Sequence, residues 1–238
     1  MRRARVRRFV GSASALALLA ASGCMHRGVS TAEHVAMATQ ASASGFRLLD
    51  LSAFRGYESE TVPAGWTVVG NEITKSRGVG DLMTKEQFGN FELELEWKMG
   101  KAGNSGIFYR ATKEYDHIYW SGIEYQLEDN ANASDNKSAD RWAGSAYALY
   151  GVPREAAKPF DEWNTTRIVV DGAHVEHWLN GQKIVEYELW SPDWKARVAA
   201  SKFKDWPNYG LAKRGYIGIQ GDHNGTLSIR NVRIRELP

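Results

Sequence analysis

The chain has 238 residues, a length that fits one sizeable β domain, and its 43% hydrophobic and 24% charged content is ordinary for a globular protein. Its formal net charge is +2, from 30 basic and 28 acidic side chains. Five of the basic residues precede Cys24 and no acid does, so the remaining chain carries 25 − 28 = −3. No basic patch is left to argue for a nucleic-acid partner.

Residues 1–23 have the pattern of an export signal. A start containing five arginines is followed by an apolar run from about Phe9 to Ala21, which is short for a membrane span. The run ends in Ala21-Ser22-Gly23-Cys24, which resembles a bacterial lipoprotein cleavage box. Cys24 is the only cysteine, so no disulfide can form within the chain, and lipid attachment is the favoured explanation of this residue.

These features predict three parts of the chain. We expect a lipoprotein signal peptide at 1–23, a flexible tether at 24–45 that is small, polar and alanine-rich, and a folded domain at 46–238. The predicted location is the periplasm or outer membrane of a Gram-negative-type bacterium, with the membrane contacted through the lipid on Cys24.

The segment 91–97 has the clearest strand pattern. Apolar Phe91, Leu93, Leu95 and Trp97 alternate with three glutamates, Glu92, Glu94 and Glu96. We expect the glutamates to lie on a convex, solvent-facing surface, where they would also discourage pairing at a sheet edge.

Two further segments alternate and form the centre of the prediction. Residues 104–110 and 123–128 both read as half-buried strands, and Glu124 and Gln126 share one face of the second. If the polar faces lie together in one sheet, Arg110 approaches Glu124 and Gln126. A charged, amide-rich face beside aromatic rings suits a sugar, and a solvated outer face is the plainer explanation.

Loops flank these strands. Residues 112–121 hold Tyr115, His117, Tyr119 and Trp120 and could rim a pocket. The polar stretch 130–141 is long, and such loops are functional or disordered more often than not. Residues 142–150 then restore the pattern of a strand.

The C-terminal third predicts a meander. Asp171-Gly172 and Asn180-Gly181 are hairpin signals that separate three short strands. His177 lies between apolar Val175 and Leu179 on one strand face, which is more typical of a core residue than of a catalyst. Residues 190–212 read as a loop with one helical turn.

The last strands carry further candidates. Ile217 and Ile219 should face inward, while Gln220 follows on the other face and His223 lies in the loop beyond, where function is common. The parity of the apolar residues in the final strand changes near Arg230 and Asn231, which predicts a bulge there. Many short strands without a long helix predict an all-β, antiparallel two-sheet jelly-roll sandwich.

An ordered set of motifs resembles a known family, the 3-keto-disaccharide hydrolase domain, from about residue 46 to the C-terminus. The motifs begin at Asp81, Phe91, Gly103, Gly122, Glu162, His177, Gly218 and Ile229 and read DLMT, FELELEW, GNSGIFYR, GIEYQLED, EWN, HWLNG, GIQGDH and IRNVRI. The chain differs from the family at Gly221, because relatives often place the Asp-His pair directly after the glutamine.

The resemblance implies a concanavalin A-like lectin and glucanase fold, an exported bacterial lipoprotein, and a glycoside substrate whose C3 hydroxyl has been oxidised to a ketone. The ketone acidifies the C2 proton, so cleavage can proceed by proton abstraction, elimination of the C1 oxygen and addition of water. Such chemistry needs a base, donors to the enolate oxygen and an acid. No dinucleotide fingerprint is visible, and this step consumes no nicotinamide.

Residues suited to these roles follow. Glu124 is the first choice for the base. His177 or His223 could serve as the acid–base partner, and a divalent metal on Glu124 or His223 could polarise the ketone. The candidates for substrate binding are Asn104, Arg110, Gln126, Asp129 and Gln220, of which Asn104, Arg110 and Gln126 could donate to the ketone or enolate oxygen.

Alternatives stay open at this stage. Glu124 and Glu128 could be the carboxylate pair of an ordinary retaining glycoside hydrolase, although residues four apart on a strand have Cα atoms about 13 Å apart. The same face without a working base would make a lipid-anchored carbohydrate-binding module. A structural surface lipoprotein is the third alternative.

Overall fold

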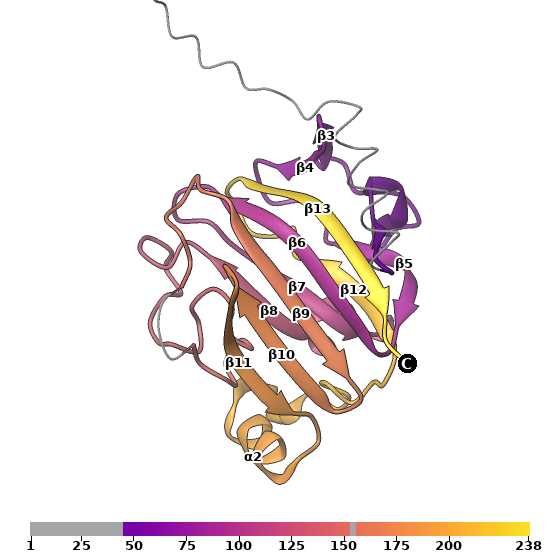
Figure 1. Ribbon diagram of the computed structural model, residues 1–238, viewed down its shortest axis with the longest axis vertical. Coiled ribbons are helices and arrows are strands. Elements are labelled where there is room, and N and C mark those ends of the chain that lie inside the picture. The colour runs from indigo at the N-terminus through magenta and orange to yellow at the C-terminus, as the bar shows by residue number, and fades with distance from the viewer. Residues whose placement is uncertain (1–44, 153–155) are drawn as a thin grey trace, which may run out of the picture.

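The computed structural model describes residues 45–152 and 156–238, so the expectations for the signal segment, for Cys24 and for the tether up to residue 44 lie outside the described residues. The described chain forms two antiparallel sheets that pack face to face (Figure 1). This confirms the all-β, two-sheet jelly-roll class predicted from alternation. Within these two ranges no helix combines the length and the apolar character that a membrane crossing requires.

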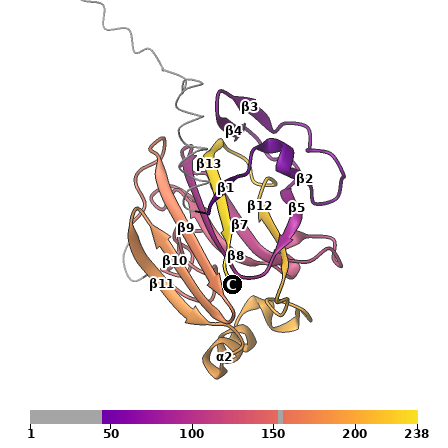
Figure 2. The same cartoon turned by 45° about the vertical axis from the view of Figure 1, so that its right-hand side comes forward.

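Sheet A is the larger layer and has eight strands. In spatial order they are β11 (Gln182–Glu188), β10 (His174–Leu179), β9 (Asn164–Asp171), β6 (Phe91–Met99), β13 (Leu227–Glu236), β4 (Glu72–Lys75) and β3 (Thr67–Val69), with β1 (Arg47–Leu48) beside β13. Figure 2 shows β3 and β4 at the end of the molecule opposite α2 (Pro192–Ala200).

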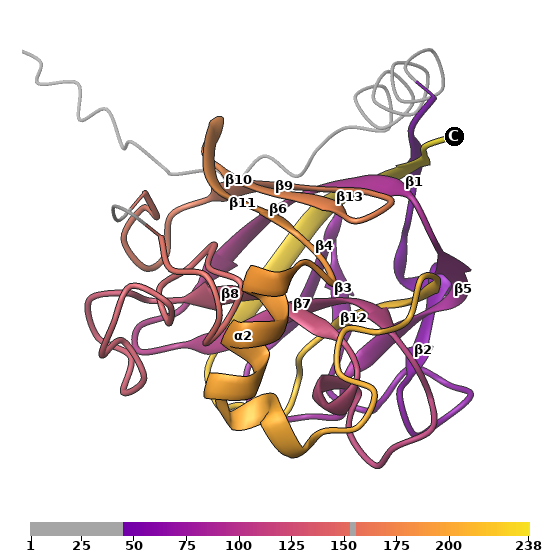
Figure 3. The ribbon, with the colours of Figure 1, turned by 90° about the horizontal axis from the view of Figure 1, so that it is seen from below.

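Sheet B has five strands and carries the candidate site. Their order is β2 (Phe54–Gly56), β5 (Leu82–Phe88), β12 (Gly215–Ile219), β7 (Asn104–Ala111) and β8 (Ile123–Glu128). In the view of Figure 3 sheet A lies above sheet B, and α2 with the chain that follows it extends below sheet B. Short 3-10 helices lie at η1 (Leu51–Ala53), η2 (Ile118–Trp120) and η3 (Lys202–Asp205).

The core fills the space between the two sheets. Each strand contributes every second side chain to it, so Leu93 of β6, Ile107 of β7 and Ile123 of β8 are at most 1% exposed. The inward set of β8 also includes Tyr125, whose hydroxyl donates to the Trp178 carbonyl of β10 at 3.1 Å. The opposite face of β8 is therefore left for Glu124 and the polar residues that share its parity.

The three glutamates of β6 lie on the outer face of sheet A, as expected, but β6 is a central strand between β9 and β13. Their partners are arginines of the neighbouring strand β13. Glu92 pairs with Arg235, Glu94 with Arg233, and Glu96 with Arg230. The prediction that these acids protect a sheet edge is thus wrong, because the ion pairs join strands across the middle of the sheet.

The turn and bulge predictions agree closely with the structure. Leu179 pairs with Gln182 across the loop Asn180-Gly181, and both loop residues have positive φ, 50° and 80°. The other hairpin also forms, but its loop is Gly172-Ala173, one residue later than the Asp171-Gly172 signal. The register of β13 shifts between Arg230 and Arg233, and Asn231 has φ of 53°, which confirms the bulge.

Two segments differ from expectation. Residues 142–150 form turns with single bridges from Ala146 to Tyr125 and Tyr150, and no strand. Residues 192–200 form α2, longer than the single helical turn expected. Its start is stabilised by Ser191, whose hydroxyl accepts from the Trp194 amide at 3.1 Å, and Pro192 is tolerated at the first helical position.

Candidate functional site

The site is built on the outer face of sheet B, where β7 and β8 pair in antiparallel register. Phe108 lies opposite Glu124, Gly106 opposite Gln126, and Asn104 opposite Glu128. Because side chains alternate along a strand, these residues all point away from the core. They form a polar floor on which the surrounding loops can enclose a ligand.

Loops and η3 raise walls around this floor and enclose a cavity of about 710 Å³. The loop after β8 contributes Ser134, Asp135 and Lys137, and the loop between β12 and β13 contributes Asp222, His223 and Asn224. The remaining lining side chains include Tyr119, Tyr147, Lys202, Phe203, Trp206 and Tyr209. The cavity therefore combines charged and amide groups with several aromatic rings.

The aromatic wall continues outward from the cavity. The Trp206 ring lies 5.7 Å from the ring of Tyr119 and is stacked on Trp120 at 5.1 Å between centroids. Tyr115 stacks on Trp120 in turn at 6.2 Å. Such flat, partly exposed rings suit the apolar faces of sugar rings.

Glu124 is the central carboxylate of the floor and is 8% exposed. It lies directly over Gly106, where a Cβ atom would come within 2.2 Å of Glu124 Oε1. When the Gln126 amide is oriented to satisfy both of its ends, its nitrogen donates to Glu124 Oε1 at 3.1 Å and to the Ser105 carbonyl at 3.3 Å. The carboxylate thus packs against the Gly106 backbone and accepts a hydrogen bond from Gln126.

The electrostatic environment favours the neutral form of Glu124. Burial raises the pKa of its carboxyl to about 8, and the Lys202 ammonium partly opposes this shift. The same burial lowers the pKa of Lys202, while Glu124 raises it. A carboxylate with a raised pKa is a stronger base once it has lost its proton, which suits abstraction of a proton from carbon.

Lys202 and its neighbours were not identified from sequence. The Lys202 ammonium lies 4.3 Å from the centroid of the Tyr147 ring. The Tyr147 hydroxyl donates to Asp135 Oδ2 at 2.6 Å, and Arg141 also binds that carboxylate. The sequence marked 130–141 and 190–212 as long or unusual stretches, but no residue within them was singled out, because loop positions carry no periodicity.

Five predicted residues are brought together in the cavity: Asn104, Glu124, Gln126, Gln220 and His223. Gln220 is 6% exposed, and its Oε1 atom accepts no hydrogen bond from any described residue. A buried acceptor without a partner costs free energy, so it is suited to receive a donor from a ligand. His223 is exposed and lies at the rim.

Arg110 is not brought to the cavity, and the prediction that it approaches Glu124 and Gln126 is wrong. Its φ of 51° interrupts the alternation near the end of β7 and redirects the side chain. The guanidinium donates to the Gly172 carbonyl at 2.9 Å, to the Gly89 carbonyl at 3.1 Å and to Asn90 Oδ1 at 3.3 Å. Arg110 therefore joins two turns away from the polar floor.

His177 lies in the core between the sheets, which corrects its selection as an acid–base candidate for the cavity. It is fully buried, and its ring nitrogens bond to the Tyr109 hydroxyl and the Gly144 carbonyl, each at 2.9 Å. Burial lowers the pKa of His177 to about 4, so the ring is neutral at physiological pH.

Asp129 is also a structural residue. Its carboxylate accepts from the amides of Ala102 at 2.8 Å and Ala131 at 3.2 Å, and from the Asn132 side chain at 2.8 Å. These bonds fix the turn that follows β8. Asp129 is 4% exposed and does not line the cavity.

Glu128 shares the face of Glu124 but is 1% exposed and does not line the cavity. Neither of its carboxyl oxygens has a hydrogen-bond partner among the described residues. Burial raises the pKa of Glu128 to about 8, and Asp135 and Asp129 add to the shift. The side chain is therefore mostly protonated at neutral pH, and it is its burial away from the cavity that disfavours the paired-carboxylate alternative.

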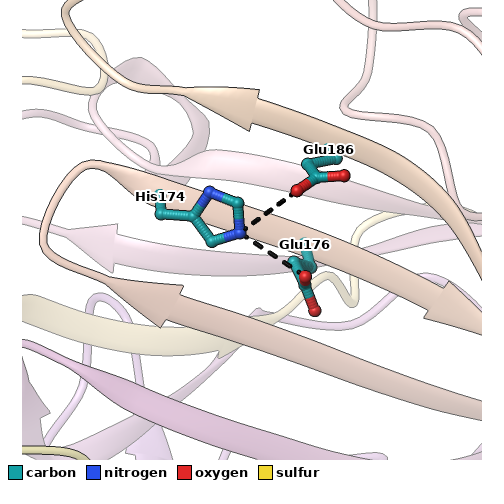
Figure 4. A group of neighbouring side chains, drawn as sticks. All are labelled: His174, Glu176 and Glu186. Carbon is teal, nitrogen blue, oxygen red and sulfur yellow. Dashed lines mark hydrogen bonds and ion pairs between the residues drawn. The ribbon is translucent and has the colours of Figure 1, made fainter.

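One group of three metal-ligand side chains occurs in the described parts of the chain, and it lies outside the cavity. His174, Glu176 and Glu186 gather on the outer face of the β10–β11 hairpin (Figure 4). The Lys183 ammonium forms ion pairs with Glu176 at 3.0 Å and with Glu186 at 2.7 Å, so these two carboxylates already have a positively charged partner. Neither Glu124 nor His223 belongs to this group.

Fold and cavity together define a two-sheet β-sandwich protein with a ligand-sized polar pocket on one sheet. The chain belongs to the family of the 3-keto-α-glucoside-1,2-lyase-like domain, whose model matches residues 47–235. It is 37% identical over 219 residues to the 3-keto-disaccharide hydrolase of Bacteroides thetaiotaomicron, and the match covers 78% of this chain and 75% of that protein.

Solved structures agree with this assignment. A Parabacteroides distasonis protein, described provisionally as a glycosyl hydrolase, superposes with a TM-score of 0.78 at 30% identity and covers 84% of this chain and 97% of its own. A second such protein from the same organism has a TM-score of 0.62 at 25% identity and covers 77% of this chain and 99% of its own.

Proposed function

We propose that the protein cleaves glycosides or disaccharides whose C3 hydroxyl has been oxidised to a ketone. Membership of the family supports a glycoside-cleaving role, and the name of the 37% identical relative supports the keto substrate. The observation that carries the proposal is Glu124, a buried carboxylate on the cavity floor that is held by Gln126 and has a raised pKa.

The proposed reaction begins at C2. The Glu124 carboxylate takes the C2 proton, and the electron pair moves into the C2–C3 bond to give an enolate. The Lys202 ammonium and the Asn104 amide line the same cavity and can donate to the enolate oxygen. Lys202 takes the role for which Arg110 was considered.

The enolate then reforms the ketone and expels the C1 oxygen, which leaves a C1–C2 double bond. His223 gives its proton to the departing oxygen. Water adds at C1 and passes a proton back to His223, while Glu124, whose abstracted proton exchanges with solvent, protonates C2, so the net reaction is hydrolysis. Gln220, with its free acceptor, can bind a sugar hydroxyl.

The direct test compares a 3-keto-glucoside bearing a chromogenic leaving group with its unoxidised parent, with and without chelator. We expect release from the keto compound alone. Loss of release with chelator would indicate that the reaction also requires a divalent metal bound by Glu124 or His223. Release from the parent compound would instead support ordinary hydrolysis, and silence from both would contradict an enzymatic role.

The second candidate is a carbohydrate-binding module, which the aromatic wall around Trp206 also suits. The two functions differ in what they need from Glu124. A binding module keeps its affinity for sugar in Glu124→Gln and shows no turnover before the substitution. An enzyme loses turnover and keeps binding.

We also propose that the protein is exported and anchored by a lipid on Cys24. Support comes from the basic start, the apolar run and the sequence Ala-Ser-Gly-Cys that ends it. Labelling of cells with a fatty-acid analogue should mark the natural protein and leave Cys24→Ser unmarked. Equal labelling of the two proteins would exclude this anchor.

A further inference from the structure

The glycine-rich segment 76–81 has no part in the proposed chemistry, yet it packs against the loop that carries Asp222, His223 and Asn224 into the cavity. Hydrogen bonds join the two segments. The Val79 amide donates to the Gly221 carbonyl at 2.9 Å, and the Gly221 amide donates to Asp81 Oδ1 at 2.7 Å.

Close backbone approach explains the glycines of this contact. A Cβ atom on Gly221 would lie 2.5 Å from the Gly80 carbonyl oxygen, and one on Gly78 would lie 2.6 Å from the Asp222 carbonyl oxygen. Any side chain at either position would push the two segments apart. Gly221 is therefore required where the loop begins.

A buried lysine holds the other end of the loop. Lys75 of β4 is 2% exposed, and its ammonium donates to the His223 carbonyl at 2.6 Å and to the Gly225 carbonyl at 3.4 Å. Charge-assisted bonds of this kind are stronger than neutral ones. Burial lowers the pKa of Lys75, while Asp222 and Asp81 favour its charged form.

We propose that Lys75 and Asp81 are positioning residues that fix the 221–225 loop and so hold His223 and Asp222 at the cavity beside Glu124. Neither residue needs to touch the substrate, because each acts through the loop backbone. The catalytic consequence rests on the proposed function. The fixation of the loop does not, because it follows from the contacts alone.

The test uses matched substitutions. Asp81→Asn keeps an oxygen that can accept from the Gly221 amide, whereas Asp81→Ala removes it. Lys75→Met keeps the length of the side chain and removes its donors. Lys98→Met is the control, since Lys98 lies on the outer face of sheet A with its ammonium 4.8 Å from the Trp163 ring centroid.

Hydrogen exchange is measured on each free protein at the amides of Gly78, Val79 and Gly221. We expect about tenfold or faster exchange there in Asp81→Ala and Lys75→Met, with the strands of sheet A unchanged. Asp81→Asn and Lys98→Met should resemble the natural protein. Uniform acceleration across the whole chain, or no difference between the Asp81 variants, would overturn the proposal.

Turnover of the 3-keto substrate supplies the second readout. The same two variants should lose about tenfold or more in kcat, with a smaller change in KM, because the loop supplies the proposed acid. Full activity despite fast loop exchange would overturn the catalytic part. If the natural protein has no turnover, the proposed function fails, while hydrogen exchange still decides whether the loop is fixed in this way.

Discussion

The position of the Glu124 carboxylate depends on Gly106, which has no side chain. Because a Cβ atom on Gly106 would come within 2.2 Å of Glu124 Oε1, Gly106→Ala must displace the carboxylate. We expect turnover to fall on the order of a hundredfold, as for a misplaced catalytic group, while sugar binding and the fold persist. Gly89→Ala is the control, since a Cβ there meets only ordinary contacts at 3.6 Å. Equal activity of the two variants would contradict the assigned role of Glu124.

The raised pKa of Glu128 leads to a prediction about how the free energy of unfolding depends on pH. Its usual pKa of 4.5 is raised to about 8 in the fold, so the folded state retains a proton that the unfolded state releases between these values. Rising pH over this window therefore destabilises the natural protein. Glu128→Gln removes this penalty, and we expect its relative stability to grow by on the order of 1–3 kcal/mol from about pH 5 to pH 8.

Urea unfolding of the two proteins across this pH range measures the difference. A constant gap between them would show that Glu128 ionises freely in the folded protein. Because Glu128 does not line the cavity, turnover by Glu128→Gln should match the natural protein. Loss of turnover would instead favour the paired-carboxylate mechanism.

At the scale of elements, the α2 helix positions the wall that sequence patterns missed. It leads into η3, which carries Lys202 and Phe203, and Trp206 follows. Ser191→Ala removes the hydroxyl that accepts from the Trp194 amide at 3.1 Å. We expect a loss of about 1 kcal/mol in stability, a rise in KM because the cavity wall shifts, and a fall in kcat because Lys202 moves with it.

Thermal unfolding and steady-state kinetics check this prediction. Ser201→Ala offers a comparison, because Ser201 caps η3 directly by accepting from the Phe203 amide at 3.0 Å. A fall in kcat alone for Ser191→Ala would show that α2 affects the chemistry and not the cavity wall.

The elements that could be predicted are those with a local rule. Alternation gave the faces of β6, β7 and β8, and the Asn180-Gly181 pair gave its turn, because period and positive φ are visible in residue types. Arg110 could not be placed, since its φ of 51° is not visible in the residue type, and its guanidinium contacts two turns that are distant in sequence. Local patterns do not reveal such tertiary contacts.

The candidate site shows the same division. Asn104, Glu124 and Gln126 were found because they share strand faces in one sheet. Lys202 reaches the cavity from η3, and Tyr147 and Asp222 from two separate loops, and only the packing of these segments over sheet B brings them there. His177 was ambiguous because a buried polar residue between apolar neighbours looks the same in a core and in a pocket.

At the scale of the whole molecule, the two faces of the sandwich have different roles. The outer face of sheet A carries ion pairs that join its strands, such as Glu94 with Arg233. The outer face of sheet B carries unpaired or weakly paired polar groups under a cover of loops. A face whose charges are already satisfied is suited to stability, and the other is suited to a ligand.

The measurement that tests the central claim most directly follows the hydrogen at C2. A 3-keto-glucoside deuterated at C2 is cleaved in ordinary water, and the released sugar is analysed at early times, with the free product alone as the control for spontaneous exchange. If Glu124 removes this hydrogen, turnover should slow with deuterium and the product should lose label beyond the control, while Glu124→Gln shows neither turnover nor loss. Full retention of deuterium together with equal rates for the deuterated and ordinary substrates would contradict proton abstraction at C2.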